Sequence, residues 1–302
     1  MPTLFWTGNI SLPLKLVVNM ASLIAWITGD AQDTSAMKQR IKNGYNGEYS
    51  DYVRRYDELG SSNYEKISRK LVEKVNWSGK EVIDVGCGTG ILSLMALENG
   101  AARMTCVDLS KLMLEKCKAK IIAEGYCEEL IEFREAEAER LPFDDESFDV
   151  VASNMVLGLI PDQEATIIEL ARVLRPNGIL ALSTQGPRLY MEAIGAGLKV
   201  MTMRYFLGHR FELWQRNENE VQSLLVNAGL KDVHTERLTW TDEFESGRDA
   251  FDFFASVSSL WWYDRLPPDL RQKETEKTRE YFQRKEIKSM TSDVVLAHGS
   301  KE

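Results

Sequence analysis

Along the middle of the chain, segments with the hydrophobic pattern of β-strands alternate with segments that have the pattern of α-helices. From Glu81 onward, short apolar runs of strand length are separated by longer stretches in which apolar residues recur at helical spacing. The predicted strands cover residues 81–85, 103–108, 131–134, 148–153 and 178–183, and the helices between them cover 91–99, 111–123 and 163–174. Pro176-Asn177-Gly178 predicts a turn before the fifth strand. Strands and helices in this order predict an α/β fold with a parallel sheet covered on both faces.

The pattern after the fifth strand is less regular. It predicts a helix over 217–228, an alternating strand over 231–241 and a late strand over 291–298. The segment 187–215 and the one between the two late strands have no place in a minimal sheet, and we assign them to a helical lid. We therefore divide the chain into an apolar leader and N-terminal cap (1–60), a cofactor-binding core (61–186), and the remainder of the sheet with the inserted lid (187–302).

The lid region is dense in aromatic residues and methionine. They are Tyr190, Met191, Met201, Met203, Tyr205, Phe206, Phe211, Trp214, Phe251, Phe253, Phe254, Trp261, Trp262 and Tyr263. The simplest interpretation is that the lid helices need a core of their own. The alternative is an apolar chamber for a hydrophobic or aromatic substrate, since small-molecule pockets are lined mostly by such groups.

The first 29 residues carry a single charge, Lys15. Their longest uncharged run, 16–29, is shorter than the roughly 20 residues that a membrane-spanning helix needs. We expect the wide apolar face of this segment to contact the protein itself or a second subunit in a homo-oligomer, or to make peripheral membrane contact. A second stripe, Tyr45, Tyr49, Tyr52 and Tyr56, falls at helical spacing, and 61–63 predict the start of a helix carrying Ile67, Leu71 and Val75.

Charge and cysteine content narrow the function classes. The formal net charge of −9 over 302 residues gives no chain-wide basis for neutralising phosphates, so a nucleic-acid partner is not expected. The four cysteines, Cys87, Cys106, Cys117 and Cys127, form no C-x-x-C pair and have no histidine at metal-ligand spacing. Their spacing therefore predicts neither a metal site nor a disulfide framework, and a reducing cytoplasmic setting fits.

The strongest candidate for a ligand-binding motif is Asp84-Val85-Gly86-Cys87-Gly88-Thr89-Gly90. Here a predicted apolar strand is followed by three glycines and then by a predicted helix. Glycine allows a tight turn and lets the main chain approach a ligand. The spacing differs from the G-x-G-x-x-G of dinucleotide folds, and Asp84 would repel a pyrophosphate. A carboxylate there suits a cationic ligand.

This segment resembles the first motif of class I S-adenosylmethionine-dependent methyltransferases, and further matches follow in order. Asp108, at the end of the second strand and followed by Leu109, resembles the acidic residue that takes both ribose hydroxyls. Glu137-Ala138-Glu139-Arg140-Leu141-Pro142-Phe143 resembles the D-A-x-x-L-P-F motif near the adenine. Residues 148–154, ending at Asn154, resemble the fourth strand, which faces the methionine part of the cofactor, and 169–178 resemble the helix and turn before the fifth strand.

The resemblance is greatest to small-molecule methyltransferases of ubiquinone and menaquinone biosynthesis. It implies a doubly wound, Rossmann-like, mostly parallel seven-stranded sheet with an antiparallel late strand, and S-adenosyl-L-methionine as cofactor. It implies a cofactor set made of Asp84, Gly86, Cys87, Gly88, Gly90, Asp108, Leu109, Glu137, Ala138 and Asn154, and a small-molecule acceptor.

Two departures from that group limit the interpretation. Glu137 stands where Asp is usual, and Gly158-Leu159 stands where the group often has a polar pair such as His-His. Catalytic residues therefore remain unassigned, with His209 and the tyrosine stripe from Tyr45 as candidates. A non-catalytic cofactor-binding protein and a nicotinamide-dependent oxidoreductase remain as alternatives.

Overall fold

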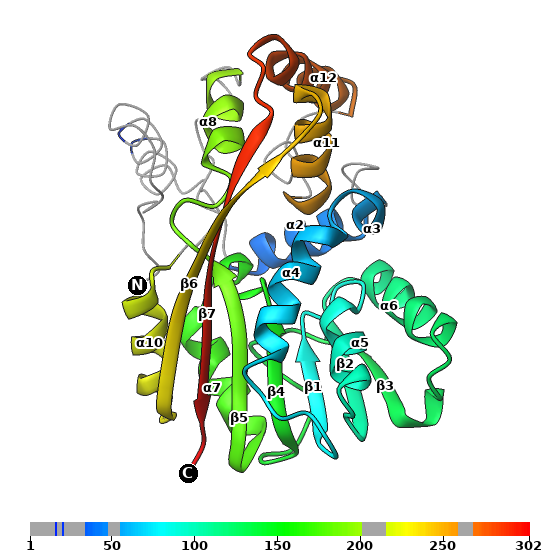
Figure 1. Ribbon diagram of the computed structural model, residues 1–302, viewed down its shortest axis with the longest axis vertical. Coiled ribbons are helices and arrows are strands. Elements are labelled where there is room, and N and C mark those ends of the chain that lie inside the picture. Colours follow the sequence, from blue (N-terminus) through cyan, green and yellow to red (C-terminus); the bar gives the residue numbers. More distant parts are fainter. Residues whose placement is uncertain (1–15, 17–19, 21–33, 48–54, 201–215, 259–267) are drawn as a thin grey trace. The chain divides into compact units, whose positions relative to one another are not determined.

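The computed structural model of the chain describes residues 16, 20, 34–47, 55–200, 216–258 and 268–302 (Figure 1). Most of the apolar leader, Tyr49 and Tyr52, and the lid segments 201–215 and 259–267 with His209 lie outside the described residues, so the predictions made for them are untested. The chain divides into two compact units. Unit 1 comprises residues 1–60, 186–215 and 239–293, and unit 2 comprises 61–185, 216–238 and 294–302.

A seven-stranded sheet in the order β3-β2-β1-β4-β5-β7-β6 organises unit 2. The strands are β1 Glu81–Val85, β2 Arg103–Asp108, β3 Ile131–Glu135, β4 Phe148–Asn154, β5 Leu174–Gln185, β6 Lys231–Glu243 and β7 Ser289–Ser300. The first five pair in parallel, and β7 runs antiparallel to β5. Every predicted strand is present, and the predicted fold class is confirmed.

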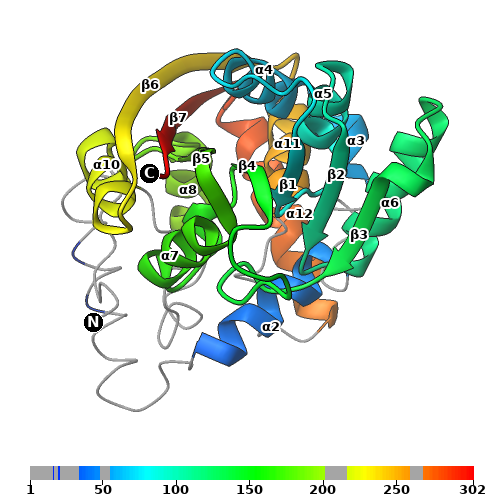
Figure 2. The same ribbon diagram turned by 90° about the horizontal axis from the view of Figure 1, so that it is seen from below.

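Helices cover the two faces of this sheet. They are α4 Ser61–Val72, α5 Ile91–Glu98, α6 Lys111–Ala123, α7 Gln163–Val173 and α10 Glu218–Asn227, with short 3-10 turns at η2 Glu128–Leu130 and η3 Leu157–Leu159. Figure 2 shows α4 and α5 on one face of the sheet and α7 on the other. The core between them is aliphatic, with Ile83, Val151, Ile167 and Leu180 fully buried.

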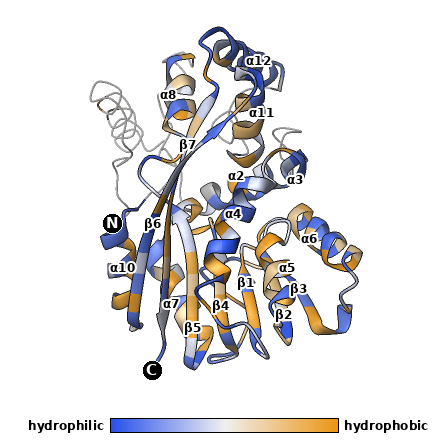
Figure 3. Ribbon diagram, in the orientation of Figure 1, coloured by the Kyte–Doolittle hydropathy of each residue, from blue (hydrophilic) through white to orange (hydrophobic). Residues whose placement is uncertain are grey.

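Local sequence sets where these helices begin. The Ser110 side chain accepts a hydrogen bond from Met113 N at the start of α6, and Asp162 accepts one from Ala165 N at the start of α7. Asn217 and Glu220 form a reciprocal capping box on α10, so Asn217 precedes the helix rather than opening it. The hydrophobic residues of β1, β4 and β5 lie mostly in the buried stretches of these strands (Figure 3).

The predicted Pro176-Asn177-Gly178 turn takes an unexpected form. Helix α7 ends at Val173, and β5 already begins at Leu174, so the three residues lie inside a strand. The register between β4 and β5 shifts there, and Asn177 adopts a φ of 61°. The turn is accommodated as an irregularity within the strand because Asn177 N and Gly178 O are both hydrogen-bonded to the backbone of Lys301.

Unit 1 contains helices α2 Thr34–Tyr45, α3 Tyr56–Leu59, α8 Met191–Val200, α11 Gly247–Ser258 and α12 Pro268–Arg284. Its core is aromatic. Phe251 packs edge-on against Phe282 at 5.4 Å, and Tyr190 packs edge-on against Phe253 at 5.6 Å. The described lid aromatics Tyr190, Phe251, Phe253 and Phe254 are all buried. These four side chains therefore lie in the interior of unit 1, as the simpler interpretation predicts, and the role of this region as a lid stays a prediction.

Charged groups add specific contacts to unit 1. Arg279 makes a two-pronged ion pair with the nearly buried Asp252, at 2.8 and 2.7 Å, and so ties α12 to α11. Among the described residues, no helix combines the length and apolar character that crossing a bilayer would require.

Candidate functional site

The carboxyl ends of β1, β2, β3 and β4 form a continuous polar edge in unit 2. Gly86 N donates to Val107 O at 2.7 Å, Ala136 N donates to Asp108 O at 3.2 Å, and the Ser153 hydroxyl donates to Val85 O at 2.8 Å. Strand order reverses between β1 and β4, and in open α/β sheets ligands bind outside the strand ends at such a point. The fold therefore brings the predicted cofactor residues from all four strands to one edge.

The glycine segment forms a loop that depends on left-handed backbone. Gly86, Gly88 and Gly90 have φ of 74°, 55° and 84°. A Cβ on Gly90 would lie 2.6 Å from the Cys117 sulfur, whereas a Cβ on Gly88 would meet no atom within 4 Å. Gly90 is thus needed for packing beneath the loop. Gly88 leaves its main chain open to close approach by a ligand.

Asp108 is held rigidly beside this loop. One carboxylate oxygen accepts a hydrogen bond from Gly88 N at 2.9 Å, and the other accepts one from Ser110 N at 2.8 Å. Burial raises the pKa of Asp108 to about 6, although the backbone hydrogen bonds favour the charged form. The carboxylate is therefore largely ionised at neutral pH. Each oxygen keeps a further lone pair, so the group can accept two more hydrogen bonds, and Leu109 beside it is half-buried.

Asp84 lies deeper, at the end of β1. Its side chain is fully buried, and one oxygen accepts a hydrogen bond from the Ser93 hydroxyl at 2.6 Å. The other oxygen, Oδ1, has no hydrogen-bond partner among the described residues. Burial raises the pKa of Asp84 to about 8, so the carboxyl is mostly protonated at neutral pH. The sequence predicts an ionised carboxylate at this position. That prediction requires a cationic group close to Asp84, because such a group would lower the pKa.

The segment after β3 places Glu137 on the surface and leaves Ala138 half-buried. A bridge joins Glu137 to Arg140, with Arg140 N donating to Glu137 O at 3.1 Å. Glu137 also makes a contact besides this bridge. Its exposure follows from the tight turn, which directs residue 137 away from the apolar core that Ala138 packs against.

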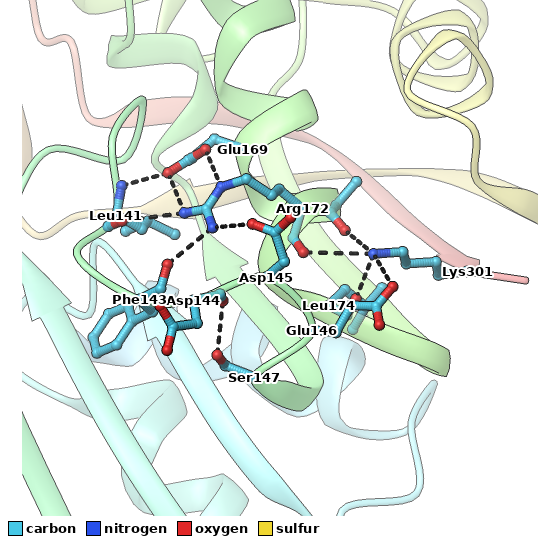
Figure 4. Close-up of polar contacts among 11 residues, drawn as sticks. Leu141, Phe143, Asp144, Asp145, Glu146, Ser147, Glu169, Arg172, Leu174 and Lys301 are labelled. Atoms are coloured by element: carbon cyan, nitrogen blue, oxygen red, sulfur yellow. Dashed lines mark hydrogen bonds and ion pairs between the residues drawn. The ribbon is translucent and has the colours of Figure 1, made fainter.

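Two side chains that the sequence reasoning did not single out fix the following loop. Figure 4 shows the Arg172 guanidinium among the Leu141 and Phe143 carbonyls, Asp145 and Glu169. Glu169 accepts a hydrogen bond from Leu141 N at 2.6 Å, and its contacts with Arg172 lower its pKa. The available signal was the Glu-x-x-Arg spacing on the helix, which places both side chains on one face.

Asn154, at the end of β4, makes hydrogen bonds through both its side-chain nitrogen and its side-chain oxygen. Its amide donates to the Ser68 hydroxyl at 2.9 Å, and its oxygen accepts from the Ser183 hydroxyl at 2.5 Å. The next residue, Met155, is buried with a φ of 61°, a left-handed conformation that is uncommon for a side chain of this size. These contacts orient the chain after β4, where the buried Gln185 accepts from Gly158 N at 3.0 Å.

Cys87 is buried within the glycine loop. Its sulfur lies close to those of Cys106 and Cys117, and the three sulfur atoms are all within 4.8 Å of one another. The sequence spacing predicts no metal site, because the three cysteines come from a loop, a strand and a helix. Only the fold brings them together.

Comparison with known proteins agrees with this arrangement. A family model described as a methyltransferase domain matches residues 83–182. The methyltransferase GfsG of Streptomyces halstedii is 33% identical over 39% of this chain and 43% of its own length. The ubiquinone biosynthesis O-methyltransferase of Pseudomonas fluorescens is 32% identical over 53% of this chain and 69% of its own length. The chain thus spans less than half the length of the first relative and about two thirds of the second.

Solved structures show the same fold. The YcgJ protein of Bacillus subtilis aligns over 78% of this chain and 98% of its own, with a TM-score of 0.56 and 18% identity. A phosphoethanolamine N-methyltransferase of Haemonchus contortus was solved with phosphomonomethylethanolamine and S-adenosylhomocysteine. It aligns over 83% of this chain and 57% of its own, with a TM-score of 0.54 and 15% identity. With the motifs on the four strand ends, the methyltransferase-domain match and the Pseudomonas relative place the chain in the family of class I methyltransferases.

Proposed function

We propose that this protein transfers a methyl group from S-adenosylmethionine to a small hydrophobic or aromatic organic acceptor. The observation that carries the cofactor part is the pairing of Asp108 with Gly88. A carboxylate fixed by two backbone N–H groups stands beside a main-chain position with no side chain and with open space around it. That combination fits a ribose, which offers two adjacent hydroxyls and needs close approach.

The other predicted cofactor residues have matching roles in the proposal. Asp84 Oδ1, buried without a partner in the described structure, would accept a hydrogen bond from the cationic methionine part, directly or through water. Ala138 and Leu141, whose backbone Glu169 and Arg172 hold in place, would support the adenine ring, and Glu137 would reach its amino group. Asn154 and Leu109 would border the site, and Gly86, Cys87 and Gly90 would shape its floor.

When bound, S-adenosylmethionine supplies an activated methyl carbon. The protein then mainly has to align the nucleophile with that carbon and exclude competing groups. The rigid strand ends of unit 2 suit this task, since β1, β2 and β4 are joined by hydrogen bonds immediately behind the site. The acceptor part of the proposal rests on the name of the Pseudomonas relative, an O-methyltransferase of ubiquinone biosynthesis.

Calorimetry with purified protein tests the cofactor. S-adenosylmethionine and S-adenosylhomocysteine should bind, and NADH should not. The matched control for Asp108→Ala is Asp144→Ala, because Asp144 is an exposed carboxylate in the loop that precedes β4, at the opposite end of that strand. Binding that survives Asp108→Ala unchanged, or preferential binding of NADH, would refute the proposed site.

A labelled methyl donor tests the acceptor. Transfer should occur to hydroxylated quinones or phenols in a panel that also contains amines and highly charged acceptors. Transfer confined to charged acceptors would contradict the acceptor class and leave the cofactor assignment standing. Cofactor binding with no transfer to any acceptor would favour a non-catalytic role.

A further inference from the structure

Three buried cysteines lie together behind the glycine loop of unit 2. Cys87 belongs to the loop, Cys106 to β2 and Cys117 to α6, and their sulfur atoms are mutually within 4.8 Å. All three side chains are buried, whereas the fourth cysteine, Cys127, is exposed. Soft thiolate ligands select soft ions, so three converging sulfurs are a candidate coordination site.

The cluster is connected to the loop by specific contacts. The Cys106 thiol donates to the Ser93 hydroxyl at 3.4 Å, and that hydroxyl donates to Asp84. The Cys117 sulfur lies directly against Gly90, where a Cβ would be only 2.6 Å away. The sulfurs are therefore held by the same packing that shapes the loop, and they form a defined triangle rather than a loose group.

The size of that triangle suits one ion bound by three sulfurs. With all sides at the 4.8 Å upper limit, an ion at the centre would lie about 2.8 Å from each sulfur. Bonds from thiolates to such ions are about 2.3 Å long, so each sulfur needs to move inward by about 0.5 Å or less. Side-chain adjustments of that size need no rearrangement of the strands.

Charge decides which kind of ion fits. Three thiolates around a divalent ion carry a net charge of −1, and an unbalanced charge is costly among buried side chains. Zinc also favours four ligands, whereas the cluster offers three sulfurs. Three thiolates around a trivalent ion form a neutral complex. We propose that Cys87, Cys106 and Cys117 bind one trivalent thiophilic ion of the arsenic(III) or antimony(III) class.

The binding step balances without a further reactant. Arsenious acid, As(OH)₃, exchanges its three hydroxyls for three cysteine sulfurs. Three As–O and three S–H bonds break, three As–S bonds form, and three waters leave, with no change of oxidation state. The step requires no S-adenosylmethionine, so binding can be measured on the cofactor-free protein and does not depend on the proposed function.

Equilibrium dialysis of the full-length protein against arsenite, with arsenic counted per chain, tests the site. One ion should bind per chain. Cys106→Ser and Cys117→Ser should each weaken binding by at least about 100-fold, because removing a direct ligand costs more than changing an outer-shell partner. Cys127→Ser is the matched control and should bind as the unaltered protein does. Equal loss in Cys127→Ser, or full binding in the other two variants, overturns the proposal.

Two measurements on the unaltered protein keep the test decisive if a variant fails to fold. X-ray absorption of the arsenic-loaded protein should find three sulfur neighbours, and two sulfurs with a retained oxygen would overturn the three-thiolate site. Competition with Cd²⁺ and Zn²⁺ tests the charge argument. Displacement of arsenite by an equal concentration of either divalent ion would contradict the preference for a trivalent ion.

Discussion

The two units of this protein use their distinctive residues in opposite ways. In unit 2, polar residues gather at the carboxyl ends of β1, β2 and β4, and the backbone holds them in place, as it holds Asp108. In unit 1, a conspicuous group of aromatic side chains is buried in the unit's own interior, with Phe251 fully enclosed. Polar residues at strand ends thus mark a candidate site in unit 2, whereas the dense aromatic residues of unit 1 form its core.

The largest expected effect is a loss of stability when a core residue of unit 1 is replaced. Phe251→Ala should lower the free energy of unfolding by about 3–5 kcal/mol, because a fully buried aromatic ring leaves a cavity. Urea unfolding measures the loss. Ile168→Ala is the control, since Ile168 is 59% exposed and should cost little. If Phe251→Ala also weakens cofactor binding in the folded protein, the contrast between a core residue and a site residue breaks down.

The second effect concerns binding rather than stability. Asp108→Ala should weaken S-adenosylhomocysteine binding by about 2–3 kcal/mol, which is roughly 30- to 150-fold, because two hydrogen bonds to a charged group are lost. Isothermal titration calorimetry measures the change. Asp108→Glu keeps the charge but shifts the oxygens, and it should recover part of the affinity. Recovery to the full value would show that charge matters more than the fixed geometry of the carboxylate.

A third effect tests how the loop after β3 is held. Arg172→Lys should lower the free energy of unfolding by about 1–2 kcal/mol, because lysine keeps the charge but loses the fork that reaches Glu169 and the Leu141 and Phe143 carbonyls (Figure 4). Combining it with Glu169→Gln in a double-mutant cycle should give less than additive losses. Strict additivity would mean that the two side chains do not act on the loop together.

A fourth effect is a pH dependence set by Asp84. Its pKa is about 8 in the folded protein against an ordinary 3.8, so the folded state retains a proton that the unfolded chain releases. Stability therefore falls as pH rises from about 4 to about 8. Between about pH 5 and about pH 8, Asp84→Asn should raise the free energy of unfolding by at least about 1 kcal/mol relative to the unaltered protein. The melting temperature of the cofactor-free protein, measured across this pH range, reports the change. Asp144→Asn should show no such gain, and an equal response in both would remove Asp84 as the cause.

Much of unit 2 could be predicted because its signals are local. The strands β1, β2 and β4 are short, largely apolar runs, and α6 begins at a serine that caps it, so neighbouring residues set these boundaries. The start of β5 differs, because hydrogen bonds to the distant Lys301 backbone draw the predicted turn into the strand. The polar strand ends are again a local signal. Parallel strands meet with their carboxyl ends at one edge, and this places Asp84 near Asp108 once the topology is known.

Other features depend on residues that are distant in the chain. The spacing of Cys87, Cys106 and Cys117 carries no motif, and the thiols meet only because β2 lies beside β1 and α6 packs beneath the glycine loop. The protonation of Asp84 likewise depends on how fully the surrounding helices and strands exclude water.

By itself, the sequence determined the order of strands and helices, the glycine loop and the family, because hydrophobic period, capping and turn chemistry act over a few residues. The tertiary structure alone decided which aromatic residues form the core of unit 1, which carboxyl is most deeply buried and which thiols lie together. Those properties follow from burial and from distances between separate elements, and neither is encoded in local spacing.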